Sequence, residues 1–272
     1  MNSKLKLSTK LSSKGTTQLA EYFATPPFKV MTLLNYSGTW LNGLNAMQMS
    51  SSPGILAGDR LDIQISLAKS TALSLNTQAF SRVQAMNAGD CAEQITQIHL
   101  AEESRLFYLP HPLVLHKDAA FKQKTIIDMQ PNSELIYGET IAIGRVLNNE
   151  RFAFRQFSSH LKIYALQNDG KKRPLVSDCI QWLPSSMTLT ALSQMENYSH
   201  QGSLLYLNLG KSAVELKAIL QTIHAHIAEE KTMLVGASLL NNGGIMVRVL
   251  GHRAEQIQDM FQNLAKDFQK ES

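Results

Sequence analysis

Glu139 is the residue of this sequence that most needs a chemical explanation. Residues 134–143 alternate as a half-buried strand does, and Glu139 shares the parity of the inward side chains. Those side chains are Leu135, Tyr137, Ile141 and Ile143. An isolated charge on an apolar face is costly, and Arg145, just after Gly144, is a natural partner for it. Two interpretations stay open, a structural Glu139–Arg145 ion pair or a carboxylate that lines a polar interior path.

A second stretch, residues 51–83, also places polar groups inward. Its strands alternate between apolar and polar residues, and Asp59 and Thr77 fall on the parity of the buried positions. Asp59 and Glu139 would then be two inward carboxylates, an arrangement that a polysaccharide-active enzyme on a stacked-β scaffold could use.

The elements that position these residues are predicted to be strands up to about residue 202. Turn signals recur at short intervals there, which indicates a sandwich, a barrel or a β-helix. From residue 203 the pattern changes to an α+β portion with two strands after the first helix. The helices are predicted near 212–230, where Ser212 and Glu215 form a capping box, and near 253–269. No linker separates the β body (about 1–202) from this portion (about 203–272), so residues 1–272 are expected to form a single domain.

Composition excludes several classes of protein. The net charge of the 272 residues is +4 with scattered basic residues, so no basic stripe predicts nucleic-acid binding. Cys91 and Cys179 are far apart and fit neither a disulfide framework nor a zinc site, which favours a reducing cytoplasm. No apolar run approaches the roughly 20 residues that cross a membrane, and no signal peptide is expected.

Two short motifs are better explained by structure than by chemistry. Gly210-Lys211-Ser212 lies between a strand and a helix, but Leu205 occupies the position where a phosphate-binding loop needs glycine, so a helix cap is expected. His224 and His226 are two apart on a helix and point in different directions. A weak surface nickel site with His252 is the alternative to ordinary packed or solvent-facing histidines. No catalytic constellation is visible, so no enzyme is predicted.

Several motifs keep a common order from about residue 25 to residue 180. They are Ser52-Pro53-Gly54, Gly58-Asp59-Arg60-Leu61, Thr77-Gln78-Ala79, Leu109-Pro110-His111-Pro112, Glu139–x4–Gly144-Arg145 and Glu150-Arg151-Phe152. In this combination the chain resembles the UreD/UreH family of urease accessory proteins. It departs from the family at His111, where Gln or Glu is common, which argues against a family metal-ligand role for His111.

The resemblance implies a mainly β fold, a β-helix-like stack of strands with two helices. It also implies a non-enzymatic role in urease maturation, with binding of urease apoprotein and of a complex between a UreF-type accessory protein and a UreG-type GTPase. Nickel(II) would be in transit through an internal tunnel, with no tightly bound cofactor and no fixed high-affinity metal site. Asp59, Thr77 and Glu139 are the candidate transit residues, and Arg145 the candidate partner of Glu139. The alternatives are the carbohydrate-active enzyme and an assembly clamp in which the carboxylates serve only the fold.

Overall fold

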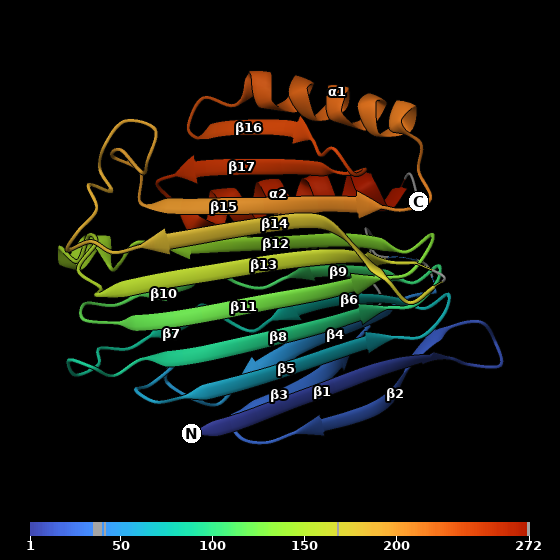
Figure 1. Cartoon of the computed structure of the whole chain (residues 1–272), viewed down its shortest axis with the longest axis horizontal. Coiled ribbons are helices and arrows are strands. Elements are labelled where there is room, and N and C mark those ends of the chain that lie inside the picture. The colour runs from blue at the N-terminus through green and yellow to red at the C-terminus, as the bar shows by residue number, and fades with distance from the viewer. Residues whose placement is uncertain (35–39, 41, 168, 271–272) are drawn as a thin grey trace.

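The structure, a computed structural model, describes residues 1–34, 40, 42–167 and 169–270. Most of the chain forms two sheets that pack face to face (Figure 1). Sheet A has the order β14-β13-β11-β8-β5-β1-β2. Its strands are β1 (Asn2–Leu11), β2 (Thr17–Ala24), β5 (Arg60–Leu67), β8 (Ala92–Leu100), β11 (Ala120–Met129), β13 (Gln156–Leu166) and β14 (Lys172–Trp182).

Sheet B has the order β16-β17-β15-β12-β9-β6-β4-β3, with β10 and β7 paired beside β12. Its strands are β3 (Phe28–Leu33), β4 (Leu44–Ser50), β6 (Ala72–Thr77), β7 (Ser81–Val83), β9 (Arg105–Leu109), β10 (Leu113–Leu115), β12 (Glu134–Ala142), β15 (His200–Asn208), β16 (Leu234–Leu239) and β17 (Ile245–Gly251).

The centre of the molecule is wound like a β-helix. The chain passes from β5 in sheet A to β6 in sheet B, back to β8, and on through β9, β11, β12 and β13, and the neighbours within each sheet are parallel. Antiparallel strands close both ends, with β1–β2 and β3–β4 at one end and β13–β14 and β12–β15–β17–β16 at the other. The predicted β-helix-like stack is confirmed.

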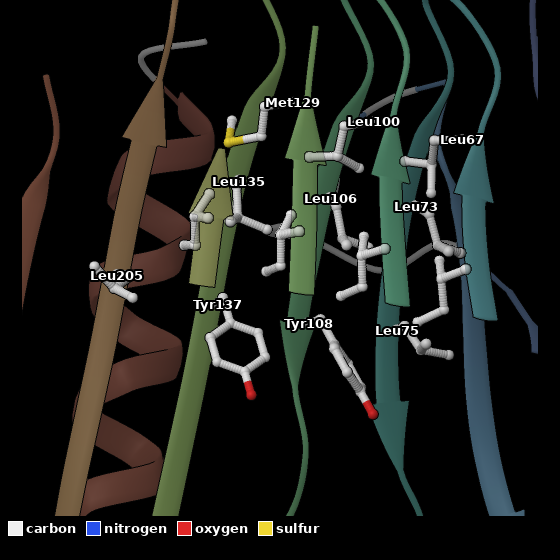
Figure 2. Close-up of a cluster of buried hydrophobic side chains, with 14 of the residues drawn as sticks. Leu67, Leu73, Leu75, Leu100, Leu106, Tyr108, Met129, Leu135, Tyr137 and Leu205 are labelled. Carbon is white, nitrogen blue, oxygen red and sulfur yellow. The ribbon is translucent and has the colours of Figure 1, made fainter. Parts of the chain in front are cut away.

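Stacked aliphatic side chains fill the space between the sheets. Leu67, Leu100 and Met129 occupy one register row in sheet A, and Leu73 and Leu106 begin the facing row in sheet B. Figure 2 shows these rows, with the side chains of Tyr108 and Tyr137 directly beyond them. Burial of this apolar surface, at roughly 25 cal/mol per Å², explains why the strands need apolar residues at alternate positions. We call this cluster the main core.

The second core lies on the other face of sheet B, under the helices α1 (Ala213–Glu229) and α2 (Ala254–Lys270). α1 begins at Ser212, whose side chain accepts from the Glu215 amide while the Glu215 side chain accepts from the Ser212 amide, so the predicted capping box is confirmed. α1 lies against β16 and α2 packs on β12, β15 and β17. The predicted C-terminal strands therefore continue sheet B. Within the described residues, no helix is long and apolar enough to cross a membrane.

A third apolar cluster closes the end of the sandwich near β7 and β10. Its largest side chains are Phe121, Phe154, Phe157 and Trp182, and the ring centroids of Phe157 and Trp182 are 5.5 Å apart. We call this cluster the end core. The loop between β12 and β13, which contains the 3-10 helix η1 (Val146–Asn148), lies at the same end.

Candidate functional site

A polar layer separates the main core from the end core. On β12 the inward residues run from Tyr137 in the main core through Glu139 to Ile141 in the end core. β8, β11 and β13 change in the same way. The inward polar residues of these strands are Gln94 and Thr96 in β8, Gln123 and Thr125 in β11, and Ser159 in β13. These polar side chains lie at the same height along neighbouring strands, so together they form the polar layer between the two cores.

Glu139 is held by side chains from the opposite sheet. The Gln123 amide donates to Glu139 Oε1, and the Ser159 hydroxyl lies 3.2 Å from both carboxylate oxygens. Gln123 Nε2 also donates to Ser159 Oγ at 3.0 Å. Burial raises the pKa of Glu139 to about 7, with the Ser159 hydrogen bond opposing this shift and the charge of Asp178 adding to it. A carboxyl group with this pKa exchanges its proton near neutral pH.

The predicted Glu139–Arg145 pair is wrong. Arg145 Nε donates to Glu150 Oε2 at 2.7 Å, and Arg145 Nη2 also pairs with Glu150. Gly144 has a φ of +144°, which favours glycine, and it packs so tightly on Glu150 that a Cβ there would collide with the Glu150 carbonyl oxygen. The chain therefore leaves the sheet after β12, and the guanidinium turns to a carboxylate of its own loop.

Thr77 ends β6 at the edge of the polar layer and contacts His111. The Thr77 hydroxyl accepts a hydrogen bond from the His111 backbone amide at 2.7 Å and lies 3.3 Å from His111 Nδ1. Thr77 is 7% exposed, as its inward parity predicted. The His111 imidazole also lines the cavity beside Glu139.

Asp59 is also buried, at 8% exposure, and the inward placement predicted for it is confirmed. Its Oδ1 lies 3.0 Å from the amino group of Met1, and its Oδ2 accepts from the Leu56 amide at 2.8 Å. The turn before β5 allows this geometry, because Gly58 adopts a left-handed conformation with a φ of +74°.

The three predicted residues line two neighbouring cavities. A cavity of about 60 Å³ is lined by Glu139 and Thr77, and one of about 290 Å³ is lined by Thr77 and Asp59. Five residues line both, namely Gln48, Ile55, Thr77, Ser81 and Gln94. A water molecule needs roughly 10–15 Å³ of such space, so even the smaller cavity has room for water. Thr77 thus lies in the wall between the cavity that contains Glu139 and the cavity that contains Asp59.

The small cavity does not suit the carbohydrate-active alternative. Sites for organic ligands have volumes of roughly 300–1,000 Å³, whereas the cavity at Glu139 has about 60 Å³. Asp59 is absent from its lining and belongs to the larger cavity alone. The two carboxylates therefore do not flank a common space in which a sugar ring could sit.

The histidines considered as a surface nickel site lie in different surroundings. His224 Nε2 is 3.1 Å from the Ala237 carbonyl oxygen, His226 faces a depression between α1 and α2, and His252 stacks on Tyr198. Across residues 1–34, 40, 42–167 and 169–270, no group of three His, Cys, Asp or Glu side chains is arranged to hold a metal ion.

Gln123 and Ser159 are the site residues that the sequence prediction did not include. Each has the inward parity of its strand, since Gln123 lies two residues after Phe121 and Ser159 two residues after Phe157. The same parity that identified Glu139 was therefore available for both. Their position opposite Glu139, however, depends on how the two sheets face each other.

Comparison with known proteins identifies a family and relatives to which the chain is similar. The family described as UreD urease accessory protein matches residues 1–271. A urease accessory protein UreD of Haemophilus influenzae (strain PittGG) is 75% identical over 266 residues, covering 98% of both chains. One of Actinobacillus pleuropneumoniae serotype 5b (strain L20) is 64% identical over 272 residues, covering 100% of this chain and 99% of the relative. The chain therefore belongs to the UreD family of urease accessory proteins.

Proposed function

We propose that this chain is a non-enzymatic scaffold of urease maturation that passes nickel(II) along the polar layer between its sheets. The observation that carries the proposal is the sharing of Thr77 by two cavities, one containing Asp59 and the other Glu139. Nickel is the cargo here, and the protein offers it a succession of oxygen atoms.

The chemistry of the lining suits passage better than storage. The contacts available beside Glu139 are a carboxylate, hydroxyls and amide oxygens, with one imidazole from His111. Oxygen ligands bind nickel less tightly than a closed set of thiolates and imidazoles. Movement through a path also requires that each site bind weakly enough to release the ion.

The raised pKa of Glu139 would couple the passage of nickel to the release and uptake of a proton. At a pKa of about 7, roughly half of the Glu139 side chains are neutral at neutral pH. A divalent cation favours the ionised carboxylate and displaces the proton. Arrival of nickel would thus release a proton from Glu139, and departure of nickel would take one up, so the site is not left with an uncompensated charge.

The proposed partners are the urease apoprotein and a complex of a UreF-type protein with a UreG-type GTPase. Two exposed leucines support a protein-binding surface at the end of the molecule near η1. Leu147 is 99% exposed and Leu192 is 83% exposed. Arg151 joins their loops, because its guanidinium donates to the carbonyl oxygens of Glu196 and Asn197 at 2.6 and 2.8 Å.

The test is co-expression of Glu139→Gln with urease and the other accessory proteins, followed by pull-down and nickel analysis. We expect normal recovery of the partners and a urease poor in nickel, because the amide keeps the shape but loses the charge. Glu93→Gln is the matched control, since Glu93 lies on the exposed outer face of β8 next to Gln94. Failure of this chain to co-purify with any partner would contradict the scaffold role, and normal nickel with Glu139→Gln would contradict a required charge at Glu139.

A further inference from the structure

The register row of Glu139 extends through sheet B toward the edge formed by β17 and β16. In the strand register Glu139 is paired with Ser203 of β15, and Ser203 is paired with Arg248 of β17. Arg248 points between the sheets, because its neighbours at the same parity, Met246 and Leu250, pack on the main core and the end core. Arg248 therefore follows Ser203 in the row that begins at Glu139.

Asp178 faces Arg248 from the other sheet. It lies on β14, the edge strand of sheet A, between Val176 at the main core and Ile180 at the end core. Arg248 Nη2 donates to Asp178 Oδ1 at 2.7 Å. The exposed fractions of the two side chains are 45% for Arg248 and 22% for Asp178. This ion pair thus bridges the two sheets where the polar layer reaches solvent.

The edge strand beside this pair leaves room for Arg248 to move. Gly236 of β16 is paired with Arg248 in the register, and side chains at paired positions point to the same face of a sheet. A Cβ at Gly236 would meet no atom within 4 Å. Gly236 itself therefore presents no side chain that would block an outward turn of Arg248.

We propose that the Asp178–Arg248 ion pair is a charge gate at the second mouth of the nickel path, which opens when Arg248 turns outward over Gly236. The inference rests on the proposed function. With the pair closed, the guanidinium presents positive charge to an approaching or leaving cation. With Arg248 turned away, the carboxylate of Asp178 becomes an oxygen ligand in line with Glu139.

The test uses variants that differ in the net charge at this mouth. The initial rate of nickel incorporation into urease is measured for each one in a purified mixture of apo-urease, accessory proteins and nickel(II). Asp178→Asn leaves an extra positive charge, and we expect a rate roughly tenfold lower. Arg248→Gln leaves an extra negative charge and should give a rate equal to or above that of the unaltered protein. Combining both substitutions restores neutrality and should return the rate to the starting level.

A purely structural ion pair gives a different pattern. Loss of either partner would then change the rate in the same direction, and that result overturns the gate. Melting temperatures should shift by only about 2–4 °C at most, because a solvent-exposed ion pair contributes little to stability. Equal folding of all three variants removes unfolding as an explanation of their rates.

Two further variants separate the gate from the proposed function itself. Gly236→Val fills the space into which Arg248 would turn and should slow nickel incorporation. Ser238→Val, on the same face of β16, is the control and should not slow it. Equal rates for these two variants would overturn the gate. Glu139→Gln is measured beside them. A low rate for Glu139→Gln with an unchanged rate for Asp178→Asn overturns the gate alone, and normal rates for Glu139→Gln overturn the nickel path and the gate with it.

Discussion

Ser159 Oγ lies 3.2 Å from both carboxylate oxygens of Glu139, and the two residues belong to opposite sheets. A hydroxyl group has one proton, so it can donate to only one of the two oxygens at a time. Glu139 is therefore positioned by neutral groups that leave its second oxygen open to another ligand. A carboxylate bound by a guanidinium on both oxygens would lack this capacity.

The first prediction concerns stability and pH. The pKa of Glu139 is raised from 4.5 to about 7 in the folded protein, so its contribution is most favourable below pH 4.5 and is lost as the pH rises to 7. This loss corresponds to at most about 3 kcal/mol. Glu139→Gln should therefore melt at a higher temperature than the unaltered protein at pH 8, with a smaller difference at pH 5. A lower melting temperature for the variant at pH 8 would contradict this assignment.

The second prediction concerns Arg145, which holds a loop and not the path. The neighbouring guanidinium lowers the pKa of Glu150, so this pair stabilises the fold at neutral pH and loses its effect as the pH falls through the acidic range. Because Arg145 is solvent-exposed, Arg145→Gln should change the melting temperature little. Urease nickel content should stay normal with Arg145→Gln. A nickel deficit with unchanged partner binding would place Arg145 on the path after all.

The parity of residues along strands identifies buried polar groups well, but it does not identify their partners. Asp59, Thr77 and Glu139 were all predictable, because alternation alone decides which face of a strand is inward. The partner of Glu139 was not, since Arg145 is near in sequence but Gly144 turns the chain out of the sheet. Gln123 and Ser159 reach Glu139 only through the stacking of coils, which no local pattern encodes.

The C-terminal elements show a similar division. The capping box at Ser212 is a local signal, and α1 begins there as predicted. By contrast, the way α2 covers sheet B depends on Gly202, where the helix side chains of Ile257 and Phe261 come close to the sheet backbone. The letters of β15 give no indication that a helix from residues 254–270 lies over this glycine.

The third prediction follows from that contact. A Cβ at Gly202 would lie 2.6 Å from an atom of Ile257 and 2.8 Å from one of Phe261, so Gly202→Val must push α2 away from sheet B. Overpacking of this kind costs roughly 1–3 kcal/mol. Chemical denaturation of Gly202→Val beside Gly236→Val, at a glycine with open space, should show the loss only for Gly202. Equal stability of the two variants would argue against the packing of α2.

The fourth prediction concerns the end of the molecule near η1. Replacement of both Leu147 and Leu192 by serine removes two of the most exposed apolar side chains. It should change the free energy of unfolding by no more than about 0.5 kcal/mol. Co-purification with at least one partner should weaken. Leu234→Ser, on exposed β16, is the control, because that side chain is 52% exposed at another part of the surface. Undiminished binding of every partner would exclude this surface.

The most direct test of the nickel path is the nickel content of urease matured with Asp59→Asn and Glu139→Gln combined. Asp62→Asn with Glu93→Gln is the matched control, because it removes the same charges from the outer face of sheet A. The path predicts that the inner pair of substitutions leaves the fold and partner binding intact and yields urease with little nickel, while the outer pair yields fully loaded urease. Normal nickel content with Asp59→Asn and Glu139→Gln combined would contradict the path.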